Sequence, residues 1–458
     1  MTNNKEAVDI KEELMMLYEE RNFRKMKPIL EEMAPADVAE FLSELTVDKA
    51  MPIFRSLSKE QSVEVFSYLE PDVQETFISS ITDQEIGGII EELSIDDAVD
   101  MLEEMPATIV KKVLKNTSSS TRKLINQFLN YPEDSVGSIM TAEFTDIKGS
   151  MTVADAIKYL RTSTDDKETI YTCYIVDQSR VLEGVVELCD ILRCDDDSTI
   201  ISDIMDTNVI KAMTTDHRES AAALFSKYDL TTLPVVDTEN RLVGIVTVDD
   251  IVDVIEEEAT KDIEQMAAMK PLETPYLKTG VFTIVRKRIV WLLILMVAGT
   301  ITGALLGTFE EAIASIPLLV TFMPMILDTG GNSGSQASTT VIRGLTTGEI
   351  DTKDVLRVVW KELRVSVLVG VIFGGLNFLR IVIFSDDPDK VMVALVVSLA
   401  MLFTIIIAKT LGAVLPLIAK KLHLDPTVMA APLITTLVDV CALLVYFELA
   451  TMLLSFRM

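Results

Sequence analysis

A carboxylate lies inside an otherwise apolar segment near the end of this 458-residue chain. The stretch PLITTLVDVCALLVYF, residues 432 to 447, contains Asp439 about one helical turn after Thr435 and Thr436. An acid in the middle of a membrane span costs roughly 2.5 to 3.5 kcal/mol on insertion scales. We therefore predict that Asp439 and the two threonines belong to an ion path, and disfavour the alternative of a satisfied structural acid.

A second segment, PMILDTGGNSGSQASTT at 324 to 340, concentrates glycine and small polar residues in a membrane-length stretch. Gly330, Gly331 and Asn332 form its centre. Irregular backbone at membrane depth is tolerated only where it is buried in protein or lines water. We predict that these glycines unwind or kink a helix and free carbonyl groups toward the path. The alternative is a close-packed helix interface made of small residues.

A third segment, DDIVDVIEEEATKDIEQMAAM at 249 to 269, is typical of a continuous amphipathic helix with a dense acidic face. Seven acids make up this face: Asp249, Asp250, Asp253, Glu256, Glu257, Glu258 and Asp262. Such a run is often only a solvated surface. It could instead be a low-affinity divalent-cation site, because neighbouring carboxylates repel until a hard cation bridges them. Pro271 and Pro275 should end the helix.

The charge distribution divides the chain into a strongly acidic part and a nearly neutral, apolar part. The formal net charge is −29, and all of it comes from residues 1 to 285, which hold 57 acids and 27 bases. Residues 286 to 458 hold 13 acids and 14 bases, with long apolar runs. The acidic surplus argues against nucleic acid as a partner. The four cysteines form no CxxC pair and there are only two histidines, which fits a reduced cytosolic compartment and no histidine-rich metal site.

The first 130 residues carry a repeat of twelve. Apolar residues recur at this spacing, and each is followed by a helix starter: Leu45, Leu57, Leu69, Ile81, Leu93 and Met105. Ser58 before Gln61 and Thr82 before Glu85 resemble capping boxes. Helices of about ten residues are marginal alone, so we expect them to stack as a small α-solenoid.

Residues 131 to 258 contain a longer duplication with strand-like alternation. YIVDQSRVLEGVVELCDIL and LPVVDTENRLVGIVTVDDIV align with an offset of 60, so that Gly184 and Asp190 recur as Gly244 and Asp250. SerIleMet at 138 to 140 and AspIleMet at 203 to 205 precede the two copies. This resembles a tandem pair of CBS domains, an α/β module that regulates and does not catalyse. The chain also lacks a GxxxxGKS/T loop, so we expect neither an ATP-driven pump nor an enzyme.

The carboxy-terminal half is predicted to hold five transmembrane helices, near 289–307, 312–340, 363–384, 391–418 and 427–454. The loops between the second and third spans and between the fourth and fifth are basic, whereas acids occupy positions 310, 311, 386, 387 and 389 in the other two. Basic loops stay in the cytosol. We therefore expect a multi-pass protein of the cell membrane, with cytosolic amino-terminal domains and the carboxy terminus outside.

The ordered set of these features resembles the MgtE family of magnesium transporters and channels over nearly the whole chain. The helical domain, YPEDSVGSIMT, the CBS pair, the acidic helix, GGNSGSQ and PLITTLVD before LLVYF all occur in the family's order. The resemblance implies a homodimer whose pore binds hydrated Mg²⁺ at Asp439, near Asn332. It also implies closure by cytosolic Mg²⁺ bound at acids of the 249 to 262 helix and at Asp425.

Two positions depart from the family pattern. Ala442 stands where a glycine is common, and Cys189 stands where the family has an arginine associated with nucleotide binding. The second departure counts against ATP as a modulator and leaves Mg²⁺ as the main expected ligand. The resemblance and the charge patterns together predict these parts: a helical superhelix at 1–130, CBS domains at 131–258, a plug-like connecting helix at 259–285 and a pore domain at 286–458.

The predicted function is a Mg²⁺ channel that admits Mg²⁺ down its electrochemical gradient and closes when cytosolic Mg²⁺ binds. Two alternatives stay open at this point. One is an exchanger that couples a divalent cation to H⁺ or Na⁺ through Asp439. The other is a membrane-bound Mg²⁺ sensor that conducts nothing.

Overall fold

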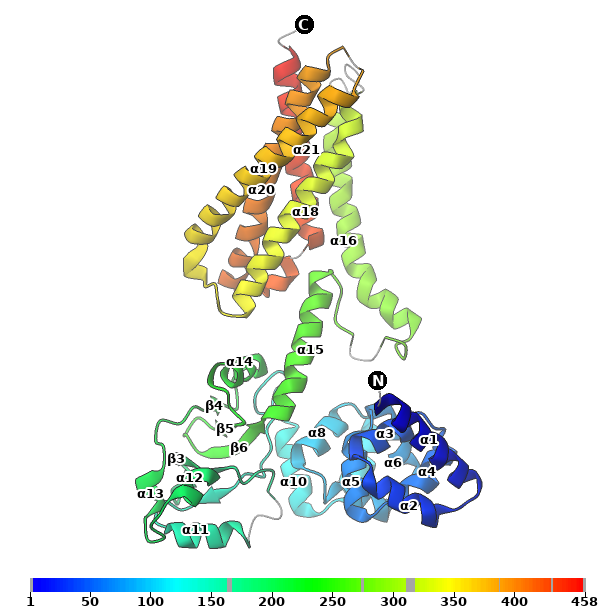
Figure 1. Cartoon of the computed structure of the whole chain (residues 1–458), viewed down its shortest axis with the longest axis vertical. Helices are drawn as coiled ribbons and strands as arrows, with labels where there is room; N and C mark the ends of the chain where they lie inside the picture. Colours follow the sequence, from blue (N-terminus) through cyan, green and yellow to red (C-terminus); the bar gives the residue numbers. More distant parts are fainter. Residues whose placement is uncertain are drawn as a thin grey trace. The chain divides into compact units, whose positions relative to one another are not determined.

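The protein forms two compact units, Met1–Ile255 and Glu256–Met458 (Figure 1). This computed structural model describes residues 3–162, 167–272, 276–309, 318–386, 388–429 and 431–455. The acids predicted for loops at 310, 311 and 387, and Pro275, lie outside the described residues.

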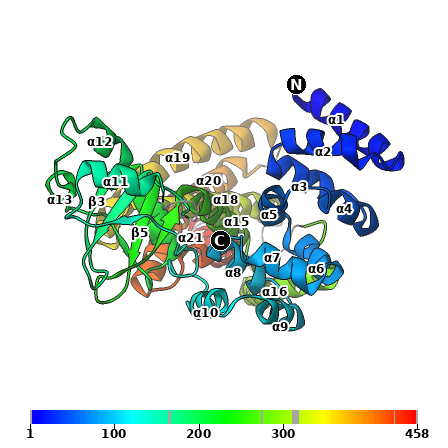
Figure 2. The same ribbon diagram turned by 90° about the horizontal axis from the view of Figure 1, so that it is seen from below.

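The first unit begins with a row of short helices that follow one another along a curve (Figure 2). They are α1 (Asn3–Glu19), α2 (Phe23–Glu32), α3 (Pro35–Ser43), α4 (Val47–Phe54), α5 (Lys59–Ser67), α6 (Pro71–Ser80), α7 (Asp83–Ile90), α8 (Ile95–Glu103), α9 (Ala107–Asn116) and α10 (Ser119–Phe128). From α3 to α10, each helix begins twelve residues after the one before it. The predicted repeat is therefore confirmed.

Local chemistry explains the regular helix starts. The Ser58 hydroxyl accepts the Gln61 N–H, and Thr82 and Glu85 form the reciprocal bonds of a capping box. Leu69, Ile81, Leu93 and Met105 of the repeat are buried in one continuous core. Each short helix is thus stabilised by packing against its neighbours.

The second part of this unit holds two copies of a small α/β fold. The first copy contains β1 (Asp146–Ile147), α11 (Val153–Leu160), β2 (Thr172–Val176), β3 (Leu182–Glu187) and α12 (Leu188–Arg193). The second contains α13 (Ile201–Ile204), β4 (Ala212–Met213), α14 (Arg218–Tyr228), β5 (Thr232–Val236), β6 (Leu242–Thr247) and the start of α15 (Val248–Met266). Each sheet has three strands, the first pair parallel and the second antiparallel, with a bulge at matching positions.

The two copies exchange their leading segments, which explains the repeated glycine. A Cβ on Gly244 would lie 2.8 Å from the Met140 sulfur, and one on Gly184 would lie 2.9 Å from the Met205 sulfur. Each methionine thus comes from the segment that leads into the other copy. The close approach requires glycine at both strands and fixes the pseudo-symmetric pairing predicted from the duplication.

The second unit is a bundle of long helices. These are α16 (Val281–Thr308), α18 (Leu318–Thr346), α19 (Val355–Phe384), α20 (Lys390–Lys421) and α21 (Ala431–Ser455), with short 3₁₀ turns η1 (Thr352–Asp354) and η2 (Pro426–Met429). Four of them, α16, α19, α20 and α21, are long and apolar enough to cross a membrane. Helix α18 is equally long, but its central sequence is polar.

The prediction that GGNSGSQ unwinds or kinks its helix is wrong, because α18 is continuous through this sequence. A Cβ on Gly330 would lie 2.7 Å from a Thr404 methyl carbon of α20, and one on Gly331 would lie 2.8 Å from a Thr435 methyl carbon of α21. The glycines therefore allow two neighbouring helices to approach, as the small-residue alternative proposed. Keeping the helical hydrogen bonds also satisfies the backbone within an apolar bundle.

Candidate functional site

Asp439 is half-buried on α21, within the helical bundle. Its Oδ1 atom is buried and has no hydrogen-bond partner. The preceding residue, Val438, packs against Gly330 of α18. A buried carboxylate oxygen without a donor is unfavourable, so this atom is suited to a cation or to the water molecules of a hydrated cation.

The neighbouring threonines differ in what they contribute. The Thr436 hydroxyl donates to the Pro432 carbonyl oxygen of its own helix at 2.9 Å. The Thr435 side chain contacts the α18 backbone at Gly331. Both threonines lie about one turn before Asp439 on the same helix, and the contact of Thr435 with α18 helps to fix the register of the two helices.

Helix α18 presents two different faces. Gly330, Gly331 and Gly334 are buried on the face toward α20 and α21. The opposite face is exposed and polar, and its members are Thr321, Asp328, Asn332, Gln336, Thr339 and Arg343. We call these six residues the polar face of α18. Asn332 therefore lies where a water-filled path could reach it, whereas the glycines serve packing.

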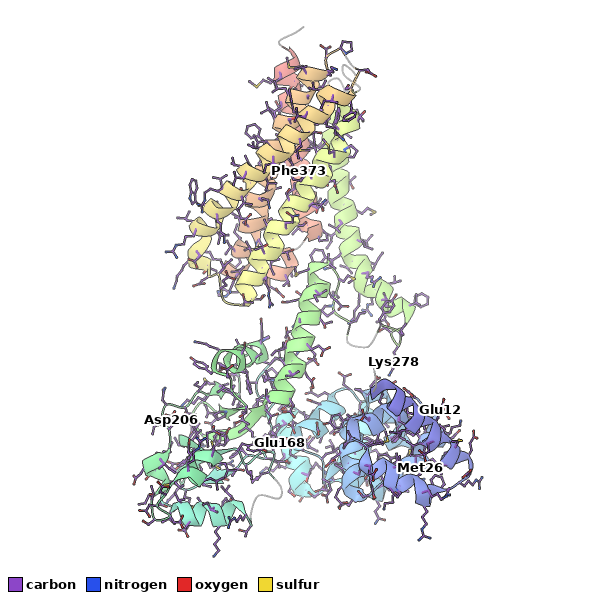
Figure 3. All side chains as sticks on the ribbon, in the orientation of Figure 1. Glu12, Met26, Glu168, Asp206, Lys278 and Phe373 are labelled. Atoms are coloured by element: carbon purple, nitrogen blue, oxygen red, sulfur yellow. The ribbon has the colours of Figure 1, made fainter. Side chains whose placement is uncertain are left out.

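A second cluster of carboxylates forms within the first unit. Asp96, Asp97 and Asp100 of α8 interact electrostatically with Asp249 and Asp250 at the start of α15. Glu168 joins them from the segment before β2, and Figure 3 labels it close to this region. We call these six residues, Asp96, Asp97, Asp100, Glu168, Asp249 and Asp250, the acidic cluster.

Burial and mutual repulsion raise the pKa values of the acidic cluster. Partial removal from water by the surrounding protein is the largest cause in each case, although Asp97 and Asp100 remain exposed and Asp250 is half-buried. It raises the pKa of Asp97 to about 6, of Asp250 to about 7 and of Asp100 to about 8. The pKa of Glu168 rises to about 7 for the same reason, with Asp96 as its strongest like-charged neighbour. Ionising all of these groups together is unfavourable, and a bound divalent cation would relieve the repulsion.

The sequence pointed to only two members of the acidic cluster, Asp249 and Asp250. Asp96 and Asp97 lie in the first turn of α8, where acids also occur simply because they favour a helix amino terminus, and Asp100 follows about one turn later. Glu168 stands in a connecting segment without a repeating pattern. The spacing of Asp96, Asp97 and Asp100 places these three acids on one side of α8. This spacing was the one sequence pattern that could have indicated them.

The other acids of α15 lie mostly toward solvent. Glu256, Glu257 and Asp253 are exposed, and Glu258 forms an ion pair with Lys261 at 3.3 Å. Among the residues that the structure describes, no three carboxylate, imidazole or thiol side chains converge closely enough to hold a metal ion. Any cation bound here would therefore be held loosely or through water.

Asp425 lies at a contact between the end of α15 and the segment that leads into α21. Its Oδ1 atom accepts hydrogen bonds from the Thr427 backbone N–H at 2.9 Å and from the Thr427 hydroxyl at 2.7 Å. The Thr427 hydroxyl also lies 2.5 Å from Gln265 Oε1 of α15. Thr427 is fully buried, so this contact links the position of α15 to the start of α21.

Comparison with known proteins identifies the family. Residues 33–134 match the MgtE intracellular N domain, residues 136–197 and 201–257 match the CBS domain, and residues 323–449 match MgtE, described as a divalent cation transporter. Over 453 residues, 98% of both chains, the sequence is 35% identical to the magnesium transporter MgtE of Thermus thermophilus. The chain belongs to the MgtE family. The magnesium transporter MgtE of Bacillus subtilis is 30% identical over 438 residues, 96% of both chains.

Solved structures match the first unit of this MgtE family member. The soluble part of a magnesium transporter gives a TM-score of 0.53 at 30% identity, covering 55% of this chain and 99% of that one. The cytosolic domain of the Mg²⁺ channel MgtE in complex with ATP gives 0.50 at 35% identity, covering 54% of this chain and 99% of that one. These matches confirm the predicted family. They also confirm the predicted fold class, which is a helical domain followed by CBS domains and a membrane region of helices.

A cysteine occupies the position that the family resemblance associates with nucleotide binding. Cys189 is exposed on α12 and carries no guanidinium group. Arg193, one turn later on the same helix, lies 3.9 Å from the Asp190 carboxylate.

Proposed function

We propose that this protein is a Mg²⁺ channel that admits Mg²⁺ to the cytosol and is closed by cytosolic Mg²⁺. The observation that carries the proposal is Asp439, whose buried Oδ1 atom has no hydrogen-bond partner within a bundle of apolar helices. The curated relatives named as magnesium transporters cover nearly the whole chain and so support Mg²⁺ as the substrate.

The proposed topology has five spans, with α18 as the span that carries a polar face. Polar residues on a membrane helix need water or another protein surface, and an ion path supplies both. Basic residues just before α19, in the first turns of α19 and in the last turn of α20 favour a cytosolic location for these helix ends. They are Lys353, Arg357, Lys361, Arg364, Lys420 and Lys421. The carboxy terminus would then lie outside.

Mg²⁺ gives up its water ligands reluctantly, so a selective path is better built from carboxylates and carbonyls that contact the hydrated ion. A homodimer, as the family resemblance implies, would bring two Asp439 carboxylates to one axis. Inward movement needs no ATP, because a membrane potential supplies about 2.3 kcal/mol per charge per 100 mV. For a divalent ion the driving force is about twice that value.

Such an influx must be stopped when cytosolic Mg²⁺ is high, and the acidic cluster is suited to sense Mg²⁺ and close the channel. At low cytosolic Mg²⁺ the carboxylates of α8 and α15 repel one another, which favours separation. Mg²⁺ bound among them would draw the helical domain toward α15. The remaining acids of α15 and Asp425 are proposed as further regulatory positions, with the contact between Gln265 and Thr427 relaying movement of α15 to α21.

Mg²⁺ uptake into proteoliposomes tests the proposal. Asp439→Asn keeps the shape of the side chain and removes its charge, so we expect Mg²⁺ influx to fall at least tenfold, about the change that 1.4 kcal/mol produces. Monodisperse protein with an unchanged melting temperature would show that the fold persists. Normal influx in this variant would remove Asp439 from the ion path.

The same preparation separates the alternatives. Mg²⁺ current that reverses at the Mg²⁺ equilibrium potential without dependence on pH or Na⁺ supports a channel, whereas coupling to either ion supports an exchanger. Absence of Mg²⁺ flux from active, well-folded protein would support a sensor.

A further inference from the structure

The polar face of α18 carries an acid at membrane depth in addition to Asp439. Asp328 lies in the central part of this helix, between apolar residues on one side and the glycine-rich sequence on the other. Its side chain is exposed on the surface of the single chain. An acid at this depth is unfavourable against lipid, so it must face water or another protein surface.

Asp328 and Asn332 interact one helical turn apart. Asn332 Nδ2 donates a hydrogen bond of 3.0 Å to Asp328 Oδ1. An ionised carboxylate only accepts hydrogen bonds, so the nitrogen of the amide must be the atom that faces Asp328. The carbonyl oxygen of Asn332 is then left to accept from another donor, such as a water molecule of a hydrated cation.

Asp328 and Asp439 lie at the same depth of the bundle. Helices α18 and α21 run antiparallel, because Leu319 bonds to Tyr446 at one end and Gly334 contacts Ile434 toward the other. Between these contacts Gly330 meets Val438. Asp328 lies two residues before Gly330 on α18, and Asp439 lies one residue after Val438 on α21. Because the helices run antiparallel, both steps lead in the same direction along the bundle, so the two acids lie at nearly the same level.

We propose that Asp328 is a second carboxylate of the cation path, which acts on the ion together with Asp439 and orients the Asn332 amide toward it. This inference rests on the proposed function, because it takes Asp439 as a residue of the path. Two carboxylates at one depth repel each other and attract a divalent cation more strongly than one carboxylate does. The chain thereby gains affinity for hydrated Mg²⁺ without a ligand set that strips its water.

Influx of Mg²⁺ into proteoliposomes, measured with the full-length protein across external Mg²⁺ concentrations, tests this proposal. Asp328→Asn keeps an acceptor for Asn332 and removes the charge. We expect the half-saturating Mg²⁺ concentration to rise about three- to tenfold, as for one charge lost from a partly solvated site. Asp328→Ala should have a larger effect, because it also releases Asn332. Glu349→Gln, in the exposed loop after α18, makes the same charge change away from the path and should leave the curve unchanged.

The possible results separate this inference from the proposed function. If Asp439→Asn abolishes influx and Asp328→Asn behaves as wild type, the role of Asp328 is overturned and the channel proposal stands. If Asp439→Asn is also without effect, the proposed function itself fails. A third result is wild-type influx in Asp328→Asn together with equal losses of influx in Asp328→Ala and Asn332→Ala. It would show that Asp328 acts only by holding Asn332, and it would overturn the proposed action of the Asp328 charge on the ion.

Discussion

At the residue scale, Gly412 marks a close approach of two helices in the bundle. A Cβ added to Gly412 of α20 would lie 2.2 Å from the Gly334 carbonyl oxygen of α18. The obstructing atom belongs to the backbone and cannot move aside without shifting a helix. The register of α18 against α20, and with it the position of the polar face, therefore depends on an absent side chain.

We expect Gly412→Ala to destabilise the bundle by about 1 to 3 kcal/mol, the usual range for overpacking. Gly375→Ala on α19 is the matched control, because no atom lies within 4 Å of its added Cβ. Thermal unfolding of the full-length protein in detergent compares the two variants. Equal melting temperatures would contradict the close approach of α18 and α20.

At the element scale, α15 carries acids beyond the acidic cluster that should contribute to closure. We expect simultaneous replacement of Glu256, Glu257 and Glu258 by Gln and of Asp262 by Asn to leave the channel open at high internal Mg²⁺. A bound cation both cancels charge and supplies directional contacts, and neutral amides reproduce the second poorly. If repulsion among these acids is instead what opens the channel, the same variant should be closed even at low Mg²⁺.

Open probability measured against internal Mg²⁺ distinguishes these outcomes. The matched control replaces four exposed acids by Gln, three in α1 and one directly after it, which changes the net charge equally at a distance along the chain: Glu12, Glu13, Glu19 and Glu20. The control should close as wild type does. A wild-type response in the α15 variant as well would assign these four acids to a solvated surface.

At the scale of the whole cytosolic unit, stability should fall as pH rises in the absence of Mg²⁺. The pKa values of Asp97, Glu168, Asp250 and Asp100 are raised to between about 6 and about 8, above roughly 4 for unfolded chains. Between these values the folded state binds more protons than the unfolded state. The free energy of unfolding therefore decreases with pH, and this contribution is lost above about pH 8.

Thermal unfolding of residues 1–266 at about pH 5 and about pH 8 measures the effect. Asp97, Asp100 and Glu168 are exposed, so solvent screens part of their repulsion and reduces its effect on stability. Each kcal/mol corresponds to about 2 to 4 °C in a unit of this size, so we expect a decrease of only a few degrees. Mg²⁺ should restore the melting temperature at the higher pH, because it binds only the folded arrangement of carboxylates. Asp100→Asn should weaken both responses. A melting temperature independent of pH and of Mg²⁺ would contradict the mutual repulsion within the acidic cluster.

The sequence by itself determined the features that depend on near neighbours along the chain. The repeat of twelve set the starts of α3 to α10, because capping residues and helix length act within a few positions. The duplication at an offset of 60 determined two matching sheets with the same bulge. Hydropathy separated the membrane helices from the acidic unit, since each span must be apolar over its own length.

Only the tertiary structure decided which distant residues meet. Asp96 and Glu168 join Asp249 because the helical domain packs against the CBS pair, and no spacing in the sequence records that contact. GGNSGSQ remains helical because its glycines are matched by Thr404, Thr435 and Gly412 on two other helices. A local pattern gives the conformation that a segment favours alone, whereas packing selects the one whose surface its neighbours can fill.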